Sequence, residues 1–204
     1  METIAYEYEG ALYVNLTNRC DCACVFCLRR NGNKGSIYAD DLWLDHEPSR
    51  EEALAAILEK HPETFRELVF CGFGEPTYRI DDVLWLVDEL KKVCALPPVR
   101  INTNGHANLL AGRDVTPELT GRIDVLSISL NGSDAAEYTA VTCPQSGELG
   151  WEAMLDFTRR AARTVPKVMM TVVNKDKTPE EIERCRALAG SLGATLRVRE
   201  YIPD

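Results

Sequence analysis

The chain has 204 residues, an apolar fraction of 45% and a formal net charge of −9 at pH 7. This length favours a single domain over residues 1–204, with enough apolar residues to bury a sizeable core. The acidic balance argues against nucleic acid or an anionic membrane surface as partner, because both need basic patches. The N-terminal residues lack a secretion pattern, and no apolar run approaches the ~18 residues of a membrane span. We therefore expect a soluble, cytoplasmic protein.

The first part of the chain predicts one strand, one long loop and one helix. Ala11–Thr17 has the β-branched and apolar residues of a strand, and a polar, cysteine-rich loop follows it to Glu47. Ser49-Arg50-Glu51-Glu52 resembles a capping box, so we expect a helix to start there. Its apolar face would consist of Leu54, Ile57 and Leu58.

The middle of the chain predicts three further strands, at Leu68–Cys71, Val99–Thr103 and Ile123–Leu130. Between the first two, apolar residues keep helical spacing from Val83 to Cys94, until two prolines end the helix. The connection between residues 109 and 120 has only a weak helical pattern.

The last part of the chain predicts two helices and two strands. Glu148–Arg163 has a helical pattern, and Lys167–Val173 has that of a strand. Thr178-Pro179-Glu180-Glu181 follows the favoured order of N-cap, proline and acids, so a second helix is expected to run from there to about Gly193. Thr195–Tyr201 then forms the last strand.

About six strands that alternate with about five helices are typical of βα units around a parallel sheet. Right-handed crossovers curl such a sheet into a barrel or into part of one. Because six strands are too few for the eight-stranded barrel, we expect an α/β fold with a partial, open parallel βα barrel. A doubly wound sheet is the alternative.

Four of the eight cysteines lie between positions 20 and 27. Among them, Cys20, Cys24 and Cys27 form the pattern C-x3-C-x2-C, and a thiolate cluster this tight selects zinc or iron–sulfur. Three thiolates on a cluster of four irons leave one iron open, and an open position is where metal chemistry happens. Taken alone, the cysteines equally fit a structural zinc site. Cys22 is not required by the pattern, and we interpret it as a bystander.

Polar residues follow every predicted strand. In parallel α/β folds the active site lies at the carboxyl ends of the strands. The segments found there are the cysteine cluster, Cys71–Thr77, Asn102–Gly105, Ser127–Gly132, Val173–Lys175 and Arg197–Tyr201. Their glycine, amide, hydroxyl and charged groups predict a binding site at this edge of the sheet.

In this order the motifs resemble those of the radical S-adenosylmethionine (SAM) superfamily. Cys20, Cys24 and Cys27 match its C-x3-C-x-Φ-C signature, with Phe26 in the aromatic slot. Gly74-Glu75-Pro76 is similar to its glycine–glycine–glutamate motif, although Phe73 replaces the first glycine. The segments ALYVNLTNRC, Asp41-Leu42-Trp43-Leu44 and FCGFGEPT are similar to the small TatD-linked radical SAM proteins.

The resemblance implies a cofactor role for each of these positions. Cys20, Cys24 and Cys27 would hold a [4Fe-4S] cluster, whose open iron would be chelated by the amino and carboxylate groups of SAM. Gly72, Gly74 and Glu75 would hold the methionyl amine. Phe26 and Val198 would pack on the adenine. The ribose and carboxylate of SAM would bind to Asn102, Asn104, Ser127, Ser129, Asn131 and Arg199.

The resemblance further implies that the reduced cluster cleaves SAM to methionine and a 5′-deoxyadenosyl radical, which abstracts hydrogen from a substrate. That substrate, a small molecule or a partner protein, is not identified by the sequence. An electron donor such as flavodoxin or ferredoxin would be a partner. The alternatives are a glycyl-radical-type activating enzyme, a synthase of a small heterocycle, and a non-catalytic zinc or iron–sulfur module.

A few other residues are candidates for roles in or near the site. Trp43 in the long first loop and Cys143 after the fourth predicted strand are candidates for the substrate side. Most buried cysteines are core residues, so we expect the same of Cys71, Cys94 and Cys185. The three histidines show no metal-ligand spacing, and we expect His106 to be a surface loop residue.

Overall fold

The computed structural model describes residues 3–27, 42–175 and 177–201. Within them, seven strands form one sheet in the order of the chain, from β1 at one edge to β7 at the other. The strands are β1 (Ala5–Tyr8), β2 (Ala11–Val14), β3 (Leu68–Phe70), β4 (Val99–Thr103), β5 (Val125–Ser129), β6 (Lys167–Asn174) and β7 (Thr195–Glu200). From β2 onward all neighbours are parallel. The sheet is open, as expected for a partial βα barrel.

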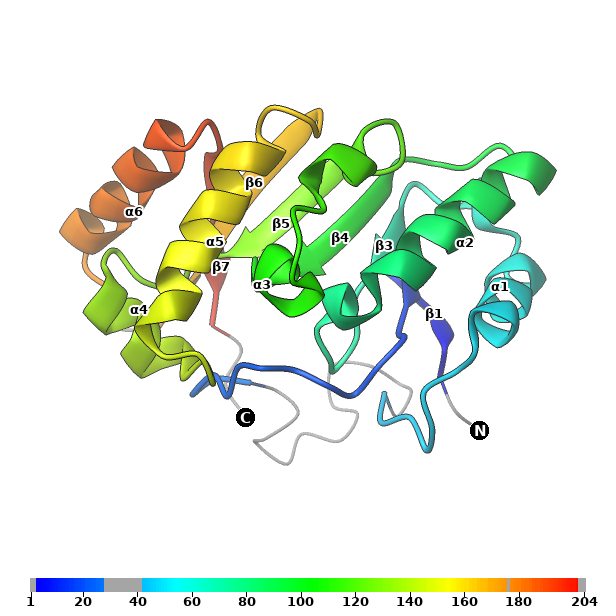
Figure 1. The fold of residues 1–204 in the computed structure, drawn as a ribbon, viewed down its shortest axis with the longest axis horizontal. Coiled ribbons are helices and arrows are strands. Elements are labelled where there is room, and N and C mark those ends of the chain that lie inside the picture. The colour runs from blue at the N-terminus through cyan, green and yellow to red at the C-terminus, as the bar shows by residue number, and fades with distance from the viewer. Residues whose placement is uncertain (1–2, 28–41, 176, 202–204) are drawn as a thin grey trace.

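The helices cover one face of this sheet (Figure 1). They are α1 (Arg50–Glu59), α2 (Ile80–Val93), α3 (Ala107–Ala111), α4 (Ala135–Thr142), α5 (Glu148–Ala161) and α6 (Pro179–Ser191). Short 3-10 turns lie at Pro62–Thr64, Pro76–Arg79 and Thr116–Leu119. The predicted capping box at Ser49 starts α1, and the predicted N-cap Thr178 starts α6. Both are capping boxes in the structure, since each cap oxygen accepts a hydrogen bond from the N3 amide. In the described part of the chain, no helix is long and apolar enough to cross a membrane.

Side chains alternate between the two faces of each strand, which separates an apolar core from a polar concave face. Ile101 on β4 and Ile128 on β5 point to the helices and join the main core cluster. Their neighbours Asn102 and Ser127 line a cavity on the opposite face. Cys185 lies in the core and Cys94 packs against it, as the sequence predicts.

The N-terminal strand β1 was not predicted. It pairs with β2 in an antiparallel hairpin, so the sheet has one strand more than expected. Glu9 and Gly10 form the turn with φ values of 47° and 74°, the left-handed backbone that a tight hairpin needs. Tyr6, buried at 3% exposure, alternates with the exposed Glu7, so a period-two signal is present in the sequence.

The predicted strand Ala11–Thr17 is shorter in the structure. It ends at Val14, and at the next residue the side-chain amide of Asn15 donates to the carbonyl of Leu42 at 2.7 Å. This bond starts the loop that carries the cysteines.

Candidate active site

A cavity of about 360 Å³ lies on the concave face of the sheet, between the cysteine loop and the carboxyl ends of the strands. Its lining includes most of the site residues predicted from the sequence. These are Cys20, Cys24, Gly72, Gly74, Glu75, Asn102, Asn104, Ser127, Ser129, Asn131 and Arg199. Residues from five separate segments of the chain therefore meet in one cavity, as the strand-end pattern predicts.

Five predicted residues do not line this cavity. Cys27 is half-buried at the end of the described loop, where its amide donates to the carbonyl of Cys24 at 3.1 Å. Phe26 is half-buried beside it. Cys143 is exposed, and its thiol contacts the carbonyl of Ala140. The remaining two are Trp43 and Val198.

Val198 was expected to pack on the adenine of SAM, but its side chain lies on the face of β7 that points away from the cavity. It packs against the apolar core, while Arg197 and Arg199 on either side of it line the cavity. The alternation of side chains along a strand forces this arrangement. The expected packing of the Val198 side chain on an adenine in this cavity is therefore wrong.

Trp43 lines a second cavity of about 410 Å³ on the other side of the cysteine loop, together with Cys20, Asp21 and Gln145. Its ring packs edge-on against Phe73, with 5.5 Å between the centroids. Phe73, which departs from the glycine of the family motif, thus forms part of the packing around this loop.

The cysteine loop is fixed by backbone pairing with the connection between α4 and α5. The amide of Ala23 donates to Thr142 at 2.9 Å, and that of Gln145 donates to Asp21 at 2.8 Å. Cys22 itself forms an isolated antiparallel bridge with Pro144. The cysteine loop is therefore held by a segment more than a hundred residues away in the chain.

The thiol of Cys22 lies among those of the predicted ligands. Hydrogen bonds with the thiols of Cys20 and Cys24, together with burial, raise its pKa well above the usual range for cysteine. Cys22 is buried, whereas Cys20 and Cys24 are half-buried. The Cys22 thiol therefore contacts two of the predicted ligands, although the sequence pattern gives this residue no role.

The two glycines after β3 are needed for contact between loops. A Cβ atom at Gly72 would lie 1.9 Å from Oδ1 of Asn15, and one at Gly74 would lie 2.1 Å from the carbonyl oxygen of Thr17. Both partners belong to the loop that leads to the cysteines. Glycine is therefore required at both positions because the cysteine loop passes too close to leave room for a side chain. This requirement is separate from any contact with a ligand in the cavity.

Glu75 is buried, at 4% exposure, and ties the end of β3 to the end of β4. Its carboxylate accepts hydrogen bonds from the amide and hydroxyl of Thr77, from the hydroxyl of Thr103 at 2.8 Å and from the amide of Asn104 at 2.7 Å. Burial raises the pKa of Glu75 even though these donors favour the charged form. Oxygen Oε2 has only the Asn104 bond, so it retains capacity for a further donor.

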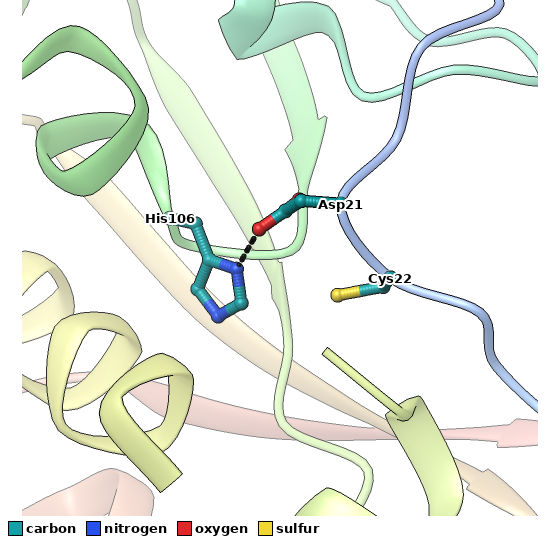
Figure 2. Close-up of side chains that lie close together, drawn as sticks. All are labelled: Asp21, Cys22 and His106. Carbon is teal, nitrogen blue, oxygen red and sulfur yellow. Dashed lines mark hydrogen bonds and ion pairs between the residues drawn. The ribbon is translucent and has the colours of Figure 1, made fainter. Parts of the chain in front are cut away.

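His106, expected at the surface, is completely buried (Figure 2). Its Nδ1 lies 2.6 Å from Oδ2 of Asp21, and its Nε2 lies 2.7 Å from the hydroxyl of Tyr138. Asn104 donates to the other oxygen of Asp21 at 2.6 Å. Burial opposes ionisation of Asp21, but the hydrogen bonds of His106 and Asn104 lower its pKa below the usual value. The network was missed because its partners are far apart in the sequence.

Asp21, Cys22 and His106 also place potential metal-ligand atoms within 4.8 Å of one another. Both ring nitrogens of His106 are already engaged, however, by Asp21 and by Tyr138. A metal ion there would have to break one of these buried bonds. We therefore assign the cluster a positioning role: it fixes the loop that carries Cys20 and Cys24.

The chain is similar to several characterised proteins over most of its own length. It is 28% identical to the mycofactocin maturase MftC of Mycolicibacterium smegmatis, over 93% of this chain and 44% of the relative. It is 26% identical to the GTP 3′,8-cyclase of Petrotoga mobilis, over 94% of this chain and 55% of the relative. The chain thus spans about half the length of these curated relatives.

Solved structures share the fold. Streptococcus suis SuiB bound to S-adenosylmethionine superimposes with a TM-score of 0.64 and 16% identity, over 93% of this chain and 38% of that chain. A radical SAM methyltransferase from Sphaerobacter thermophilus gives a TM-score of 0.66 and 14% identity, over 96% and 57% of the two chains.

The match to a family model covers the cysteine loop and the parallel strands β3 to β6. Residues 14–189 match the model of the Radical SAM superfamily. Three spaced cysteines after the first parallel strand, an open barrel and polar strand ends around one cavity agree with that match. The chain belongs to the radical SAM superfamily.

Proposed function

We propose that this chain is a radical SAM enzyme in which Cys20, Cys24 and Cys27 hold a [4Fe-4S] cluster and the cavity beside them holds SAM. One observation carries the proposal. A single cavity is lined by Cys20 and Cys24 at its mouth and by glycine, amide and hydroxyl groups from the ends of the strands. Because several of its segments resemble those of the small TatD-linked radical SAM proteins, we further propose that the chain belongs to that group.

The described residues fit such a ligand. Within the described residues the three cysteines are not in disulfides, and soft thiolates are the preferred ligands of iron–sulfur clusters. Oxygen Oδ1 of Asn102 is buried and has no hydrogen-bond partner, although the residue lines the cavity. A buried polar atom without a partner is unfavourable, so a donor from a ligand would stabilise it. The ribose hydroxyls of SAM are donors of this kind.

When bound, the cluster and SAM supply one-electron cleavage of SAM to methionine and a 5′-deoxyadenosyl radical that abstracts hydrogen from the substrate. The chain's residues bind and orient. Asn102, Ser127 and Ser129 offer amide and hydroxyl groups to the ribose, and Arg199 offers its guanidinium to the carboxylate of SAM. Oε2 of Glu75 and the backbone at Gly72 and Gly74 are placed to accept from the amine.

Asn104 lines the cavity, and its side chain also makes bonds within the protein. Its amide nitrogen donates to Asp21, and its amide oxygen accepts from the amide of His106 at 3.0 Å. It therefore contributes to SAM binding chiefly by holding the cysteine loop against the end of β4.

A second candidate is a synthase that acts on a small heterocycle or nucleotide. The similarity to a GTP 3′,8-cyclase favours this class over a glycyl-radical activating enzyme. SuiB, which has been solved with its precursor peptide, supports a peptide substrate instead. A non-catalytic zinc module is disfavoured, because the polar strand ends would then have no ligand.

We further propose flavodoxin or ferredoxin as the electron donor. Three reduced thiols as ligands also favour a reducing compartment such as the cytoplasm.

Anaerobic reconstitution with iron and sulfide tests the proposal. We expect about four irons per chain and release of 5′-deoxyadenosine from SAM that depends on a reductant. Bound zinc, or iron without any cleavage of SAM, would contradict it.

Single cysteine variants test the ligand assignment. Cys20→Ala, Cys24→Ala and Cys27→Ala should each abolish cleavage of SAM, because each removes one of three thiolates. Cys22→Ala is the matched control from the same loop, and it should retain the cluster. Equal loss from Cys22→Ala and Cys24→Ala would reassign the ligands to the thiols that lie together in the structure.

A further inference from the structure

We infer that the substrate of this site carries an oxyanion, a carboxylate or a phosphate, which binds to Arg197 on the concave face of the sheet. The inference rests on the proposed radical SAM function, because it places the substrate in the cavity assigned to SAM. It goes beyond that function by naming the chemical class that the substrate must contain.

The cavity carries more positive than negative charge, although the whole chain is acidic. Its charged lining residues are Arg100, Arg197, Arg199, Glu9 and Glu75. Glu75 already accepts four hydrogen bonds from the chain itself. Arginines thus outnumber acids among the described residues that line this cavity, although the protein has a net charge of −9.

The charge of Arg100 is compensated by an acidic side chain, whereas the charges of Arg197 and Arg199 on β7 have no such partner within the described residues. Arg100 is buried, and its Nη2 lies 3.2 Å from Glu67 and 3.3 Å from the hydroxyl of Tyr13. Arg197 and Arg199 are exposed to the cavity. Within the described residues, neither guanidinium makes an ion pair or a hydrogen bond with another side chain. Two cations on one strand are thus available for ligands.

The strand register places the two arginines at different depths. Arg199 pairs with Val173, near the carboxyl end of β6, while Arg197 pairs with Thr171, two residues further from that end. Arg199 is therefore closer to the level of the cysteine loop, where the carboxylate of SAM is proposed to bind. SAM has a single carboxylate, so Arg197 is left for a second anion.

Hydroxyl groups lie in the same row as Arg197. Thr171 pairs with Arg197 on one side and with Ser129 of β5 on the other, and all three residues line the cavity. The Thr171 hydroxyl donates to the carbonyl of Ile128 at 3.5 Å, and Ser129 is shared with the proposed ribose site, so the guanidinium of Arg197 is the principal donor of this row. A guanidinium suits an oxyanion because its fork of N–H groups can donate to two oxygens. An uncharged substrate would leave the Arg197 charge without a partner.

Isothermal titration calorimetry on the reconstituted protein with SAM tests the inference. The probes are inorganic pyrophosphate, for a phosphate, and succinate, for a carboxylate. We expect one of them to bind with a stoichiometry of one, and Arg197→Gln to weaken this binding by about tenfold or more. Arg197→Lys, which keeps the charge, should lose less affinity.

Arg186→Gln is the matched control, because it removes the same charge from an exposed arginine of α6 that pairs only with Glu183. Binding of the probe should be unchanged in this variant. The inference is wrong if neither probe binds the wild type, or if Arg197→Gln and Arg186→Gln weaken binding equally. A thermal unfolding transition like that of the wild type shows that the Arg197→Gln variant is folded.

Release of 5′-deoxyadenosine in the same wild-type samples separates the two proposals. Cleavage of SAM without a bound probe would overturn the anion site alone. A bound probe without any cleavage of SAM would overturn the radical SAM function, and with it the interpretation of this site as a substrate site.

Discussion

His106 is hydrogen-bonded to Asp21 across 85 residues of sequence, with 2.6 Å between Nδ1 and Oδ2. Asp21 directly follows Cys20, and His106 lies at the start of α3, beyond the end of β4. The other ring nitrogen contacts Tyr138 of α4. One buried imidazole thus connects the cysteine loop to two elements of the barrel, and we expect the geometry of the proposed cluster ligands to depend on it.

Replacing His106 with alanine should lower the free energy of unfolding by about 3 kcal/mol, because Asp21 and Tyr138 would each lose a buried partner. The reconstituted variant should also bind less iron than the wild type. Chemical denaturation and iron analysis measure the two effects. His46→Ala is the control, since the His46 side chain is 58% exposed and lies 3.8 Å from Glu52. An effect of His106→Ala no larger than that of His46→Ala would contradict the positioning role.

Gly74→Ala should destabilise the protein by about 2 kcal/mol or more, because its Cβ atom would lie 2.1 Å from a backbone oxygen that has no room to move. Gly190→Ala is the opposite case, since a Cβ atom in that exposed position of α6 meets nothing within 4 Å. It should stabilise the protein by up to about 1 kcal/mol, as alanine is the better helix former. Thermal unfolding of both variants measures the contrast, and destabilisation by both would refute it.

Glu137 should stabilise the fold at neutral pH and lose this effect in acid. Burial opposes its ionisation, but Lys177 and the amide of Ser133 donate to its carboxylate and lower its pKa. A lowered folded pKa contributes stability above the unfolded value of about 4.3, and the contribution disappears as pH falls through the folded pKa. Glu137→Gln should therefore cost about 1 to 3 kcal/mol at pH 7 and progressively less below pH 4.

Urea denaturation across this pH range measures the difference for Glu137→Gln. Glu183→Gln is its control, because Glu183 is exposed at 69% and pairs only with Arg186. That variant should change stability little at any pH. A difference between wild type and Glu137→Gln that stays constant from pH 7 to pH 3 would contradict the prediction.

Asn102→Ala should weaken binding of SAM more than it weakens the fold. Among the described residues its Oδ1 atom has no hydrogen-bond partner, and the bond of its side chain with the Cys71 thiol is weak because sulfur is a weak acceptor, so its loss costs the fold little. We expect the dissociation constant for SAM to rise by about tenfold, and the free energy of unfolding to change by less than about 1 kcal/mol. Calorimetry with SAM and denaturation of the apoprotein measure these values. Unchanged affinity would remove Asn102 from the binding site.

The parallel strands could be predicted from sequence because each is a short β-branched run between turn or helix signals. β1 was missed although Tyr6 and Tyr8 alternate with Glu7, because an alternation over four residues without an apolar run is a weak signal. Within the site, the residues at strand ends were found because parallel strands present their carboxyl ends on one edge.

The partners of the buried site residues could not be predicted. The sequence gives no sign of the hydrogen-bond partners of His106, since Asp21 and Tyr138 lie 85 and 32 residues away. The role of Gly72 also depends on tertiary structure, because the atom that excludes a side chain belongs to Asn15. Val198 was assigned to the wrong face, because the side of the strand that faces the cavity is fixed by packing against α6.

A crystal structure of the anaerobically reconstituted protein with SAM tests the central claim most directly. We predict an iron–sulfur cluster on Cys20, Cys24 and Cys27, with the ribose of SAM within hydrogen-bond distance of Asn102 and the C5′ carbon facing the cavity toward Arg197. A zinc ion on these cysteines, or SAM bound outside this cavity, would contradict the claim.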